Sequence, residues 1–218
     1  TASGYSFSVN GICAESRQLS GNSSVTIVLT TDGKRIKIYT DPSLTVLDNE
    51  ITVLCSGEEV ILECITYANG STYGINTEKV YKIDMASGAA TEITNASQTG
   101  SNCFIFANFQ QEKVYCIVDG NVRIIDVSDD TVTSPANTLP DTPFIGETLS
   151  NFIIDVEGHI WFKGKRYDGS TLAEIASIGG NDSYSNWYTP TIIILYDGVR
   201  SGGTNFMIYT IEGERLYN

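Results

Sequence analysis

The feature of this sequence that most restricts its fold is a β-hairpin pattern that recurs five times. In each copy two apolar runs flank a short turn, which is the signature of two antiparallel strands. Four turns carry Asp-Gly or Glu-Gly, and the fifth carries Thr77-Glu78. The copies span residues 25–39, 73–83, 114–125, 152–162 and 206–217. A repeat of this kind predicts an all-β chain built from one recurring unit.

The spacing of the turns favours one architecture. The turns lie at residues 32, 77, 119, 157 and 212, so the successive intervals are 45, 42, 38 and 55 residues. Propeller blades of four antiparallel strands run about 40–50 residues. We therefore expect residues 1–218 to form a single domain, a five-bladed β-propeller with four-stranded blades. A β-sandwich or a pair of small barrels is the alternative fold.

Segments beside the hairpins supply the remaining strands. A strand precedes the hairpin at residues 60–66, 103–108 and 191–196, and a short strand follows it at residues 90–93 and 172–175. Between hairpin and outer strand lie Asp-led turns, at residues 84–88, 126–130 and 168–170. The hairpin is thus expected to form strands two and three of a blade. The last copy stops after its third strand, so residues 5–9 are predicted to supply the outer strand of the last blade and close the ring.

This blade pattern resembles the divergent propeller repeats of the NHL and YVTN type, in which a strand–turn–strand unit ends in Asp and a Gly-containing turn. It lacks the Gly-His and Trp-Asp signatures of WD40 repeats and the paired glycines of kelch repeats. The resemblance implies an architecture. It does not imply a particular function, because one fold can carry many unrelated sites.

The charge of the chain argues against some partners. Its formal net charge of −13 repels phosphate backbones and anionic membrane surfaces, so neither nucleic acid nor a membrane is expected as a partner. No apolar run approaches the roughly 18 residues that span a bilayer. The chain begins with Thr1 rather than Met, which predicts that it is processed or excised from something longer.

The cysteines do not predict a metal site. None forms a CxxC pair, and with His159 as the single histidine a structural zinc site is not expected. Cys103 and Cys116 are expected to lie opposite each other on paired strands, either as a cross-strand disulfide or as two buried thiols. The five cysteines are Cys13, Cys55, Cys64, Cys103 and Cys116.

Catalytic signals are weak. His159 follows the turn at Glu157 and Gly158, where a rim position is expected, and no Gly-x-Ser-x-Gly elbow is present. Paired carboxylates are the remaining candidates for catalytic groups, because glycoside hydrolases place two acids about 5–10 Å apart. We expect no enzyme, and a glycoside-cleaving propeller is the alternative. Its candidate acids are Glu15, Glu63, Glu147 and Asp197.

No cofactor is expected, and calcium is the one alternative. Asp126, Ser128 and Asp130 alternate as in part of a calcium loop, but the bidentate Glu that such loops supply later is missing. A plain turn is therefore favoured over a calcium site.

The interval of 55 residues predicts an insertion at residues 179–190. This loop should lie on the face of the propeller where binding loops gather, and large aromatic residues dominate contact energies there. The predicted ligand-binding residues are Asp182, Tyr184, Trp187 and Tyr188. The alternative is that Trp187 and Tyr188 fill the core between the fourth and fifth blades.

Taken together, these features predict a non-catalytic binding or assembly module that recognises protein or glycan. Few lysines, abundant Ser, Thr, Asn and Gly, and the missing initial Met suit an extracellular or virion surface protein, including a phage protein. Such a module is expected to form part of a larger multi-protein assembly.

Overall fold

The structure of the chain is a computed structural model, and its described part consists of strands and one short 3-10 helix, η1 (Thr94–Ala96). The residues that it describes are 4–9, 12–18, 24–40, 46–101, 103–108, 112–139, 152–155, 157–162, 165–177, 183–189, 192–197, 205–210 and 215–217. No helix among them is long and apolar enough to cross a membrane. The chain divides into two compact units, residues 1–134 with 139–143 and residues 135–138 with 144–218.

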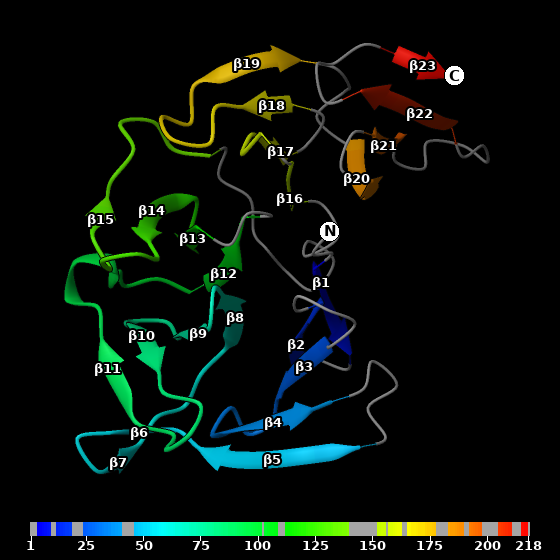
Figure 1. Ribbon diagram of the computed structural model, residues 1–218. Helices are drawn as coiled ribbons and strands as arrows, with labels where there is room; N and C mark the ends of the chain where they lie inside the picture. The colour runs from blue at the N-terminus through cyan, green and yellow to red at the C-terminus, as the bar shows by residue number, and fades with distance from the viewer. Residues whose placement is uncertain are drawn as a thin grey trace. The chain divides into compact units, whose positions relative to one another are not determined.

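The first unit contains three antiparallel sheets, which Figure 1 labels strand by strand. The first sheet has five strands in sequence order: β1 (Gly4–Val9), β2 (Ile12–Gln18), β3 (Ser24–Leu29), β4 (Arg35–Tyr39) and β5 (Leu47–Thr52). The second sheet comprises β8 (Cys64–Ala68), β9 (Ser71–Ile75), β10 (Val80–Ile83) and β11 (Ala90–Glu92). The third comprises β12 (Cys103–Ala107), β13 (Lys113–Val118), β14 (Asn121–Asp126) and β15 (Val132–Thr133). A small hairpin, β6 (Leu54–Cys55) and β7 (Glu58–Glu59), follows the first sheet.

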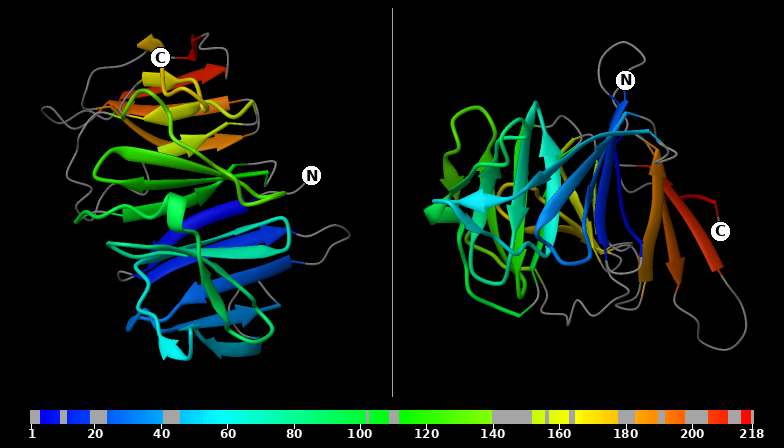
Figure 2. Two further views of the ribbon diagram at one scale, coloured as in Figure 1. Left: turned by 90° about the vertical axis from the view of Figure 1, so that its left-hand side faces the viewer. Right: turned by 90° about the horizontal axis from the view of Figure 1, so that it is seen from below.

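Corresponding strands of neighbouring sheets lie side by side in this unit. Strand β2 contacts β8, and β8 in turn contacts β12, so the three sheets meet along these strands. Figure 2 shows this unit, coloured from blue to green, from two further sides. Buried aliphatic side chains from all three sheets fill the space between them and exclude water. Among the most buried are Ile36, Ile65, Ile75, Ile105 and Ile125.

The second unit contains two further antiparallel sheets of four strands each. The fourth sheet of the chain comprises β16 (Phe152–Ile154), β17 (Ile160–Phe162), β18 (Lys165–Tyr167) and β19 (Glu174–Ser177). The fifth comprises β20 (Ser183–Thr189), β21 (Ile192–Asp197), β22 (Asn205–Thr210) and β23 (Arg215–Tyr217). In both sheets the strands follow sequence order, so each sheet is made from one continuous stretch of chain.

All five predicted hairpins are present as paired antiparallel strands. The turn at Asp119 and Gly120 is a two-residue connection in which both residues have positive φ, 46° and 81°. These angles belong to a type I′ turn, whose twist matches the twist of the flanking strands. In the second and third sheets the hairpins are β9–β10 and β13–β14, which are the middle strands as predicted, whereas in the five-stranded first sheet β3–β4 are the third and fourth strands.

The position of the hairpin within the sheet differs in the last two sheets. There it forms the first two strands, β16 and β17, of the fourth sheet and the last two, β22 and β23, of the fifth. Turns rich in glycine join other strand pairs as well, such as β8 and β9 through Asn69 and Gly70. The residues of a turn therefore predict that a hairpin is present, but they do not predict which strands of the sheet the hairpin forms.

This shift explains the long interval of 55 residues. The predicted insertion at residues 179–190 is wrong, because most of this stretch forms strand β20. The connections between the middle strands of the five sheets fall at residues 30–34, 76–79, 119–120, 163–164 and 198–204. Counted in this way, the interval before the last sheet is not longer than the others.

The predicted place of the N-terminal strand is also wrong. Residues 5–9 belong to β1, which pairs with β2 in the first sheet, and the last sheet has four strands of its own. The physical reason is proximity along the chain. Asn10 and Gly11 separate β1 from β2 in the sequence, and Asn-Gly between alternating strands is a strong hairpin signal.

The predicted Asp-led turns are confirmed and prove closely alike. In each, the carboxylate accepts a hydrogen bond from the amide two residues later and a second one from a neighbouring hydroxyl. These bonds hold the pKa of Asp84, Asp126 and Asp168 below its ordinary value. The residue four places after each Asp has positive φ: Gly88 (76°), Asp130 (58°) and Leu172 (56°).

Two glycines allow close contacts within the first unit. The amide of Leu62 donates to the carbonyl of Gly33, and the amide of Leu54 donates to that of Gly88. Both glycines have positive φ, and a Cβ on either would overlap backbone atoms, of Leu62 for Gly33 and of Thr52 for Gly88. The backbone can approach only because these positions lack a side chain.

A polar cluster ties the second sheet to the third. The carboxylate of Asp130 accepts hydrogen bonds from the Tyr73 hydroxyl at 3.0 Å and from the Lys82 ammonium at 2.8 Å. Tyr73 is buried, and burial followed by the Asp130 hydrogen bond raises the pKa of its hydroxyl. The carboxylate at the end of the Asp126 turn is thus engaged by the neighbouring sheet.

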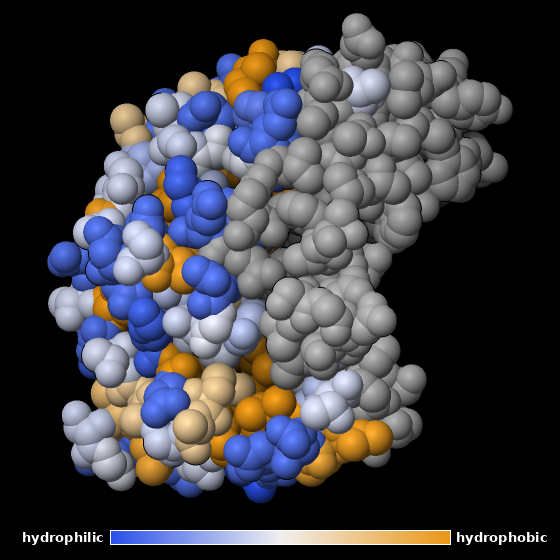
Figure 3. Space-filling model, viewed as in Figure 1, coloured by the Kyte–Doolittle hydropathy of each residue, from blue (hydrophilic) through white to orange (hydrophobic). Residues whose placement is uncertain are grey.

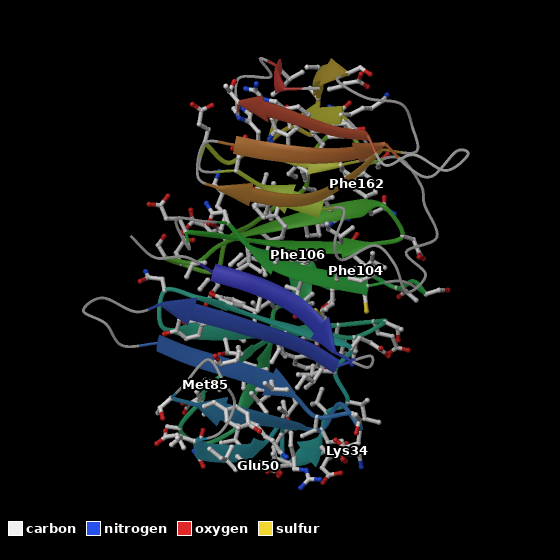
Figure 4. All side chains as sticks on the ribbon, turned by 90° about the vertical axis from the view of Figure 1, so that its right-hand side faces the viewer. Lys34, Glu50, Met85, Phe104, Phe106 and Phe162 are labelled. Carbon is white, nitrogen blue, oxygen red and sulfur yellow. The ribbon has the colours of Figure 1, made fainter. Side chains whose placement is uncertain are left out.

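Charged side chains follow the outer strands of the first sheet. Lys34 pairs with Glu59 at 2.7 Å and Arg35 with Glu50 at 2.8 Å, and Figure 4 labels Lys34 and Glu50 in this region. Exposed pairs of this kind add little stability, but charges along an outer strand discourage edge-to-edge association. Figure 3 shows hydrophilic residues interspersed with hydrophobic ones over the described face of this unit.

The cysteines differ from the expected arrangement. Cys103 pairs with Val118 and Cys116 with Ile105, so the two cysteines are diagonal neighbours rather than opposite each other. Both are free and buried, as the thiol alternative predicted, and burial raises the pKa of each. The register of β12 against β13 therefore differs by two residues from the one that would place the two cysteines opposite each other. Cys55 is a third free thiol, whereas Cys64 is disulfide-bonded.

Candidate functional site

The polar centre with the richest set of contacts lies in the fourth sheet, around Asp155. This residue comes directly after β16, and its side chain is fully buried. One carboxylate oxygen accepts hydrogen bonds from the amides of Glu157 and His159, both at 2.9 Å. The other accepts one from the indole nitrogen of Trp161 at 2.8 Å. A buried carboxylate is tolerable when donors saturate it in this way.

Local backbone geometry builds this centre. The amide of Gly158 donates to the carbonyl of Asp155 at 3.0 Å, which closes the turn between β16 and β17. Gly158 has φ of +85°, a conformation that glycine adopts at little cost. The turn then directs the amides of residues 157 and 159 toward the Asp155 side chain. Strand β17 begins at once and brings Trp161 back to the same carboxylate.

His159 and Arg166 complete the centre. Nδ1 of His159 lies 3.3 Å from a carboxylate oxygen of Asp155, 3.4 Å from one of Glu157 and 3.4 Å from a guanidinium nitrogen of Arg166. Arg166 comes from β18, where it pairs with Trp161, and its guanidinium lies 5.7 Å from the centre of the indole ring. Such cation–π contacts are favourable within about 6 Å. Only 9% of Arg166 is exposed.

The chemistry available to this centre is limited. Nucleophilic catalysis needs a hydroxyl or thiol within reach of a base, whereas the described side chains that bond or pair with His159 are the charged groups of Asp155, Glu157 and Arg166. Asp155 already accepts three N–H donors, so it is poorly placed to act as a general acid. The arrangement suits a rigid polar anchor that fixes the β16–β17 turn against β18.

The predicted ligand-binding residues fall on or beside β20. Tyr184, Trp187 and Tyr188 lie on this strand, where they pair with Tyr196, Ile194 and Ile193 of β21. The register shifts between Ser185 and Trp187, which marks a bulge or irregularity. The side chains of these three residues, and the whole of Asp182, lie outside the described part of the structure. Their predicted role in binding stays a prediction.

The candidate acids are only partly described. Glu63 is exposed and lies immediately before β8. Glu15 lies on β2 and Asp197 ends β21, but their side chains lie outside the described part, as does all of Glu147. The predicted convergence of these acids on one site therefore stays untested.

The possible calcium loop has the bonding of a turn. The carboxylate of Asp126 accepts hydrogen bonds from the amide and hydroxyl of Ser128, and that of Asp130 bonds to Lys82 and Tyr73. These oxygens face protein donors. Within the described ranges, no group of three or more His, Cys, Asp or Glu side chains is arranged to hold a metal ion.

The Asp155 centre is the site that sequence reasoning missed. The signal was present in the fourth hairpin, where Asp155 precedes Gly158 by three residues and His159 and Trp161 follow it. Read as a hairpin, this stretch predicts a turn and two strands. One carboxylate accepts hydrogen bonds from both amides and from the indole. This arrangement depends on the conformation of the turn, which the residue pattern does not specify.

No protein-family model matches the chain, and no curated protein matches it. Among solved structures, a WD40-type propeller chain from the crystal structure of a mitotic checkpoint complex is similar, with a TM-score of 0.53 and 11% identity. The match covers 96% of this chain and 67% of that one. Glutaminyl cyclase from Myxococcus xanthus matches over 49% of this chain and 59% of its own, with 17% identity and a TM-score of 0.33. At these identities a likeness concerns the fold, and of these two matches the first is close enough to support an argument. The chain accordingly has a β-propeller-like fold built from antiparallel sheets.

Proposed function

We propose that the chain is a non-catalytic binding or assembly module carried on a five-bladed β-propeller. The observation that carries this proposal is the bonding of the polar groups best placed for chemistry. Asp155 accepts three N–H donors in a buried position, and the carboxylate of Asp130 is bonded to Lys82 and Tyr73. Carboxylates used in this way stabilise the scaffold, which leaves function to surfaces and loops.

The five-bladed ring is part of this proposal. Each of the five sheets is one blade made from consecutive strands, and β1 adds a fifth strand to the first blade. Among the described strands, none is exchanged between one sheet and another. The recurrence of the Asp-led turn in three consecutive sheets supports blades of the NHL and YVTN type.

The proposed partner is a protein or a glycan, bound near β20. Asp182, Tyr184, Trp187 and Tyr188 supply aromatic and acidic groups that stack on sugars or anchor a protein contact. We place the module in an extracellular or virion surface assembly. The disulfide at Cys64 supports this placement, because disulfides persist in oxidising compartments.

A glycan array combined with a reducing-sugar assay tests the proposal. The expected result is binding without release of sugar, weakened at least tenfold by Trp187→Ala. Tyr39→Ala, which removes an aromatic residue of β4 in the first unit, is the matched control and should bind normally. If no glycan binds, cross-linking within the native assembly should place a protein partner at β20.

One outcome would instead favour the glycoside-cleaving alternative. That outcome is release of sugar by the wild-type chain that is lost in Glu63→Gln or Glu15→Gln. Paired carboxylates would then be the functional groups, and the binding residues on β20 would at most position the substrate.

A further inference from the structure

His159 occupies an unusual position among charged groups. A single ring nitrogen, Nδ1, has oxygens of Asp155 and Glu157 at 3.3 and 3.4 Å and a guanidinium nitrogen of Arg166 at 3.4 Å. The side chain is about 20% exposed, so protons from solvent can reach the ring. It is also the only histidine in the chain.

These contacts cannot all be favourable at once. An unprotonated Nδ1 carries a lone pair and can accept a hydrogen bond from Arg166, but it then offers no proton to either carboxylate. A protonated Nδ1 can donate to Asp155 or Glu157, but it no longer accepts from Arg166. The charged ring also repels the guanidinium. The protonation state of one atom therefore selects between two sets of partners.

We propose that His159 is a pH-controlled switch that exchanges Arg166 for the two carboxylates as its bonding partner. Above the titration midpoint, the neutral ring accepts from Arg166 and holds the guanidinium over Trp161. Below the midpoint, the charged ring bonds to Asp155 and Glu157 and releases Arg166.

The charged groups that face His159 favour either the charged or the neutral form of its ring. Asp155 and Glu157 come from the same turn and favour the charged ring, whereas Arg166 comes from β18 and favours the neutral one. Asp168, which follows β18, also interacts with the ring through its charge, and it too favours the charged form. These are the charged groups that face the ring from the described residues.

Trp161 is the built-in reporter of the switch. Its indole nitrogen donates to the same Asp155 oxygen that lies 3.3 Å from His159, and its ring lies under the Arg166 guanidinium. When His159 becomes charged, it competes for this oxygen and Arg166 leaves the ring. Both changes alter the environment of the indole.

Nitrogen-15 NMR of the unmodified chain tests the proposal directly, because one histidine gives one set of ring signals. The neutral ring should carry its proton on Nε2, with Nδ1 free to accept from Arg166. The Trp161 indole signal should shift with pH at the same midpoint as the ring. A neutral ring protonated on Nδ1, or an indole signal that does not follow the ring, would overturn the proposal.

Two variants test the partners. Glu157→Gln removes one exposed negative charge and should lower the midpoint of His159 by about 0.5–1 pH unit, while Arg166→Gln should raise it. Shifts in the opposite direction would contradict the exchange. Arg166 is buried and its replacement can unfold the sheet, so the tautomer measurement and the exposed Glu157→Gln keep the proposal falsifiable. His159→Gln should abolish the pH response of Trp161.

Discussion

The carboxylate of Asp155 accepts a hydrogen bond from the indole nitrogen of Trp161 at 2.8 Å, and both side chains are fully buried. The same carboxylate bonds two amides of the β16–β17 turn. Asp155→Ala should therefore lower the free energy of unfolding by about 3–5 kcal/mol, because it leaves the buried indole nitrogen and two part-buried amides without their acceptor. Chemical denaturation followed by tryptophan fluorescence measures the loss.

Glu157→Ala is the matched control for this change. It removes a carboxylate two residues away that is 48% exposed, and it should alter the free energy of unfolding by no more than about 0.5 kcal/mol. Equal losses in the two variants would show that Asp155 does not anchor the turn.

Two glycines allow the cost of a close backbone contact to be measured separately from the cost of a positive φ. Gly57 and Gly88 both have positive φ, but a Cβ at Gly57 would meet open space and one at Gly88 would overlap the Thr52 carbonyl. Gly57→Ala should cost about 1 kcal/mol from φ strain alone. Gly88→Ala should cost about 1–3 kcal/mol more, because the backbone must move. Urea unfolding of both variants measures the two losses in the free energy of unfolding. Equal losses would mean that the backbone contact at Gly88 is not close.

The cysteines predict how many free thiols the unfolded chain has before and after reduction. Unfolded without a reductant, the chain should titrate three thiols, those of Cys55, Cys103 and Cys116, and after reduction it should titrate five. In the native state Cys55 should react with iodoacetamide first, because burial raises the pKa of Cys103 to about 12 and also that of Cys116. Five thiols without reduction would contradict the disulfide at Cys64.

The Asp-led turns predict a loss of stability in acid. Hydrogen bonds lower the folded-state pKa of Asp84, Asp126 and Asp168, so these groups stabilise the fold above the ordinary pKa near 3.8. The contribution is lost as pH falls through the lowered values. Asp84→Asn should therefore weaken the chain at pH 6 more than at pH 3, as measured by urea unfolding. An equal loss at the two pH values would mean that the charged Asp84 carboxylate does not stabilise the fold.

How much of this fold was predictable varies from element to element. The turn at Asp119 and Gly120 was predictable because these residue types tolerate positive φ, and the Asp-led turns because an Asp side chain can bond the amide two residues later. The strand β20 was not, because its stretch of Ser, Tyr and Asn residues is typical of a loop and forms a strand by pairing with the apolar β21. Tertiary pairing overrode local composition there.

The candidate site was less predictable than the fold. Asp155, His159 and Trp161 lie within seven residues, yet their convergence depends on the turn that Gly158 closes. Arg166 joins them only through the register of β17 and β18. The centre is defined by hydrogen-bond geometry, and a pattern of residue types in the sequence does not predict that geometry.

Small-angle X-ray scattering tests most directly the proposal that all five sheets form one propeller. A compact single domain of 218 residues should have a radius of gyration of about 17 Å. The account predicts a value near this figure and a distance distribution with one maximum. A clearly larger radius with a two-lobed distribution would mean that the two units do not close into one ring.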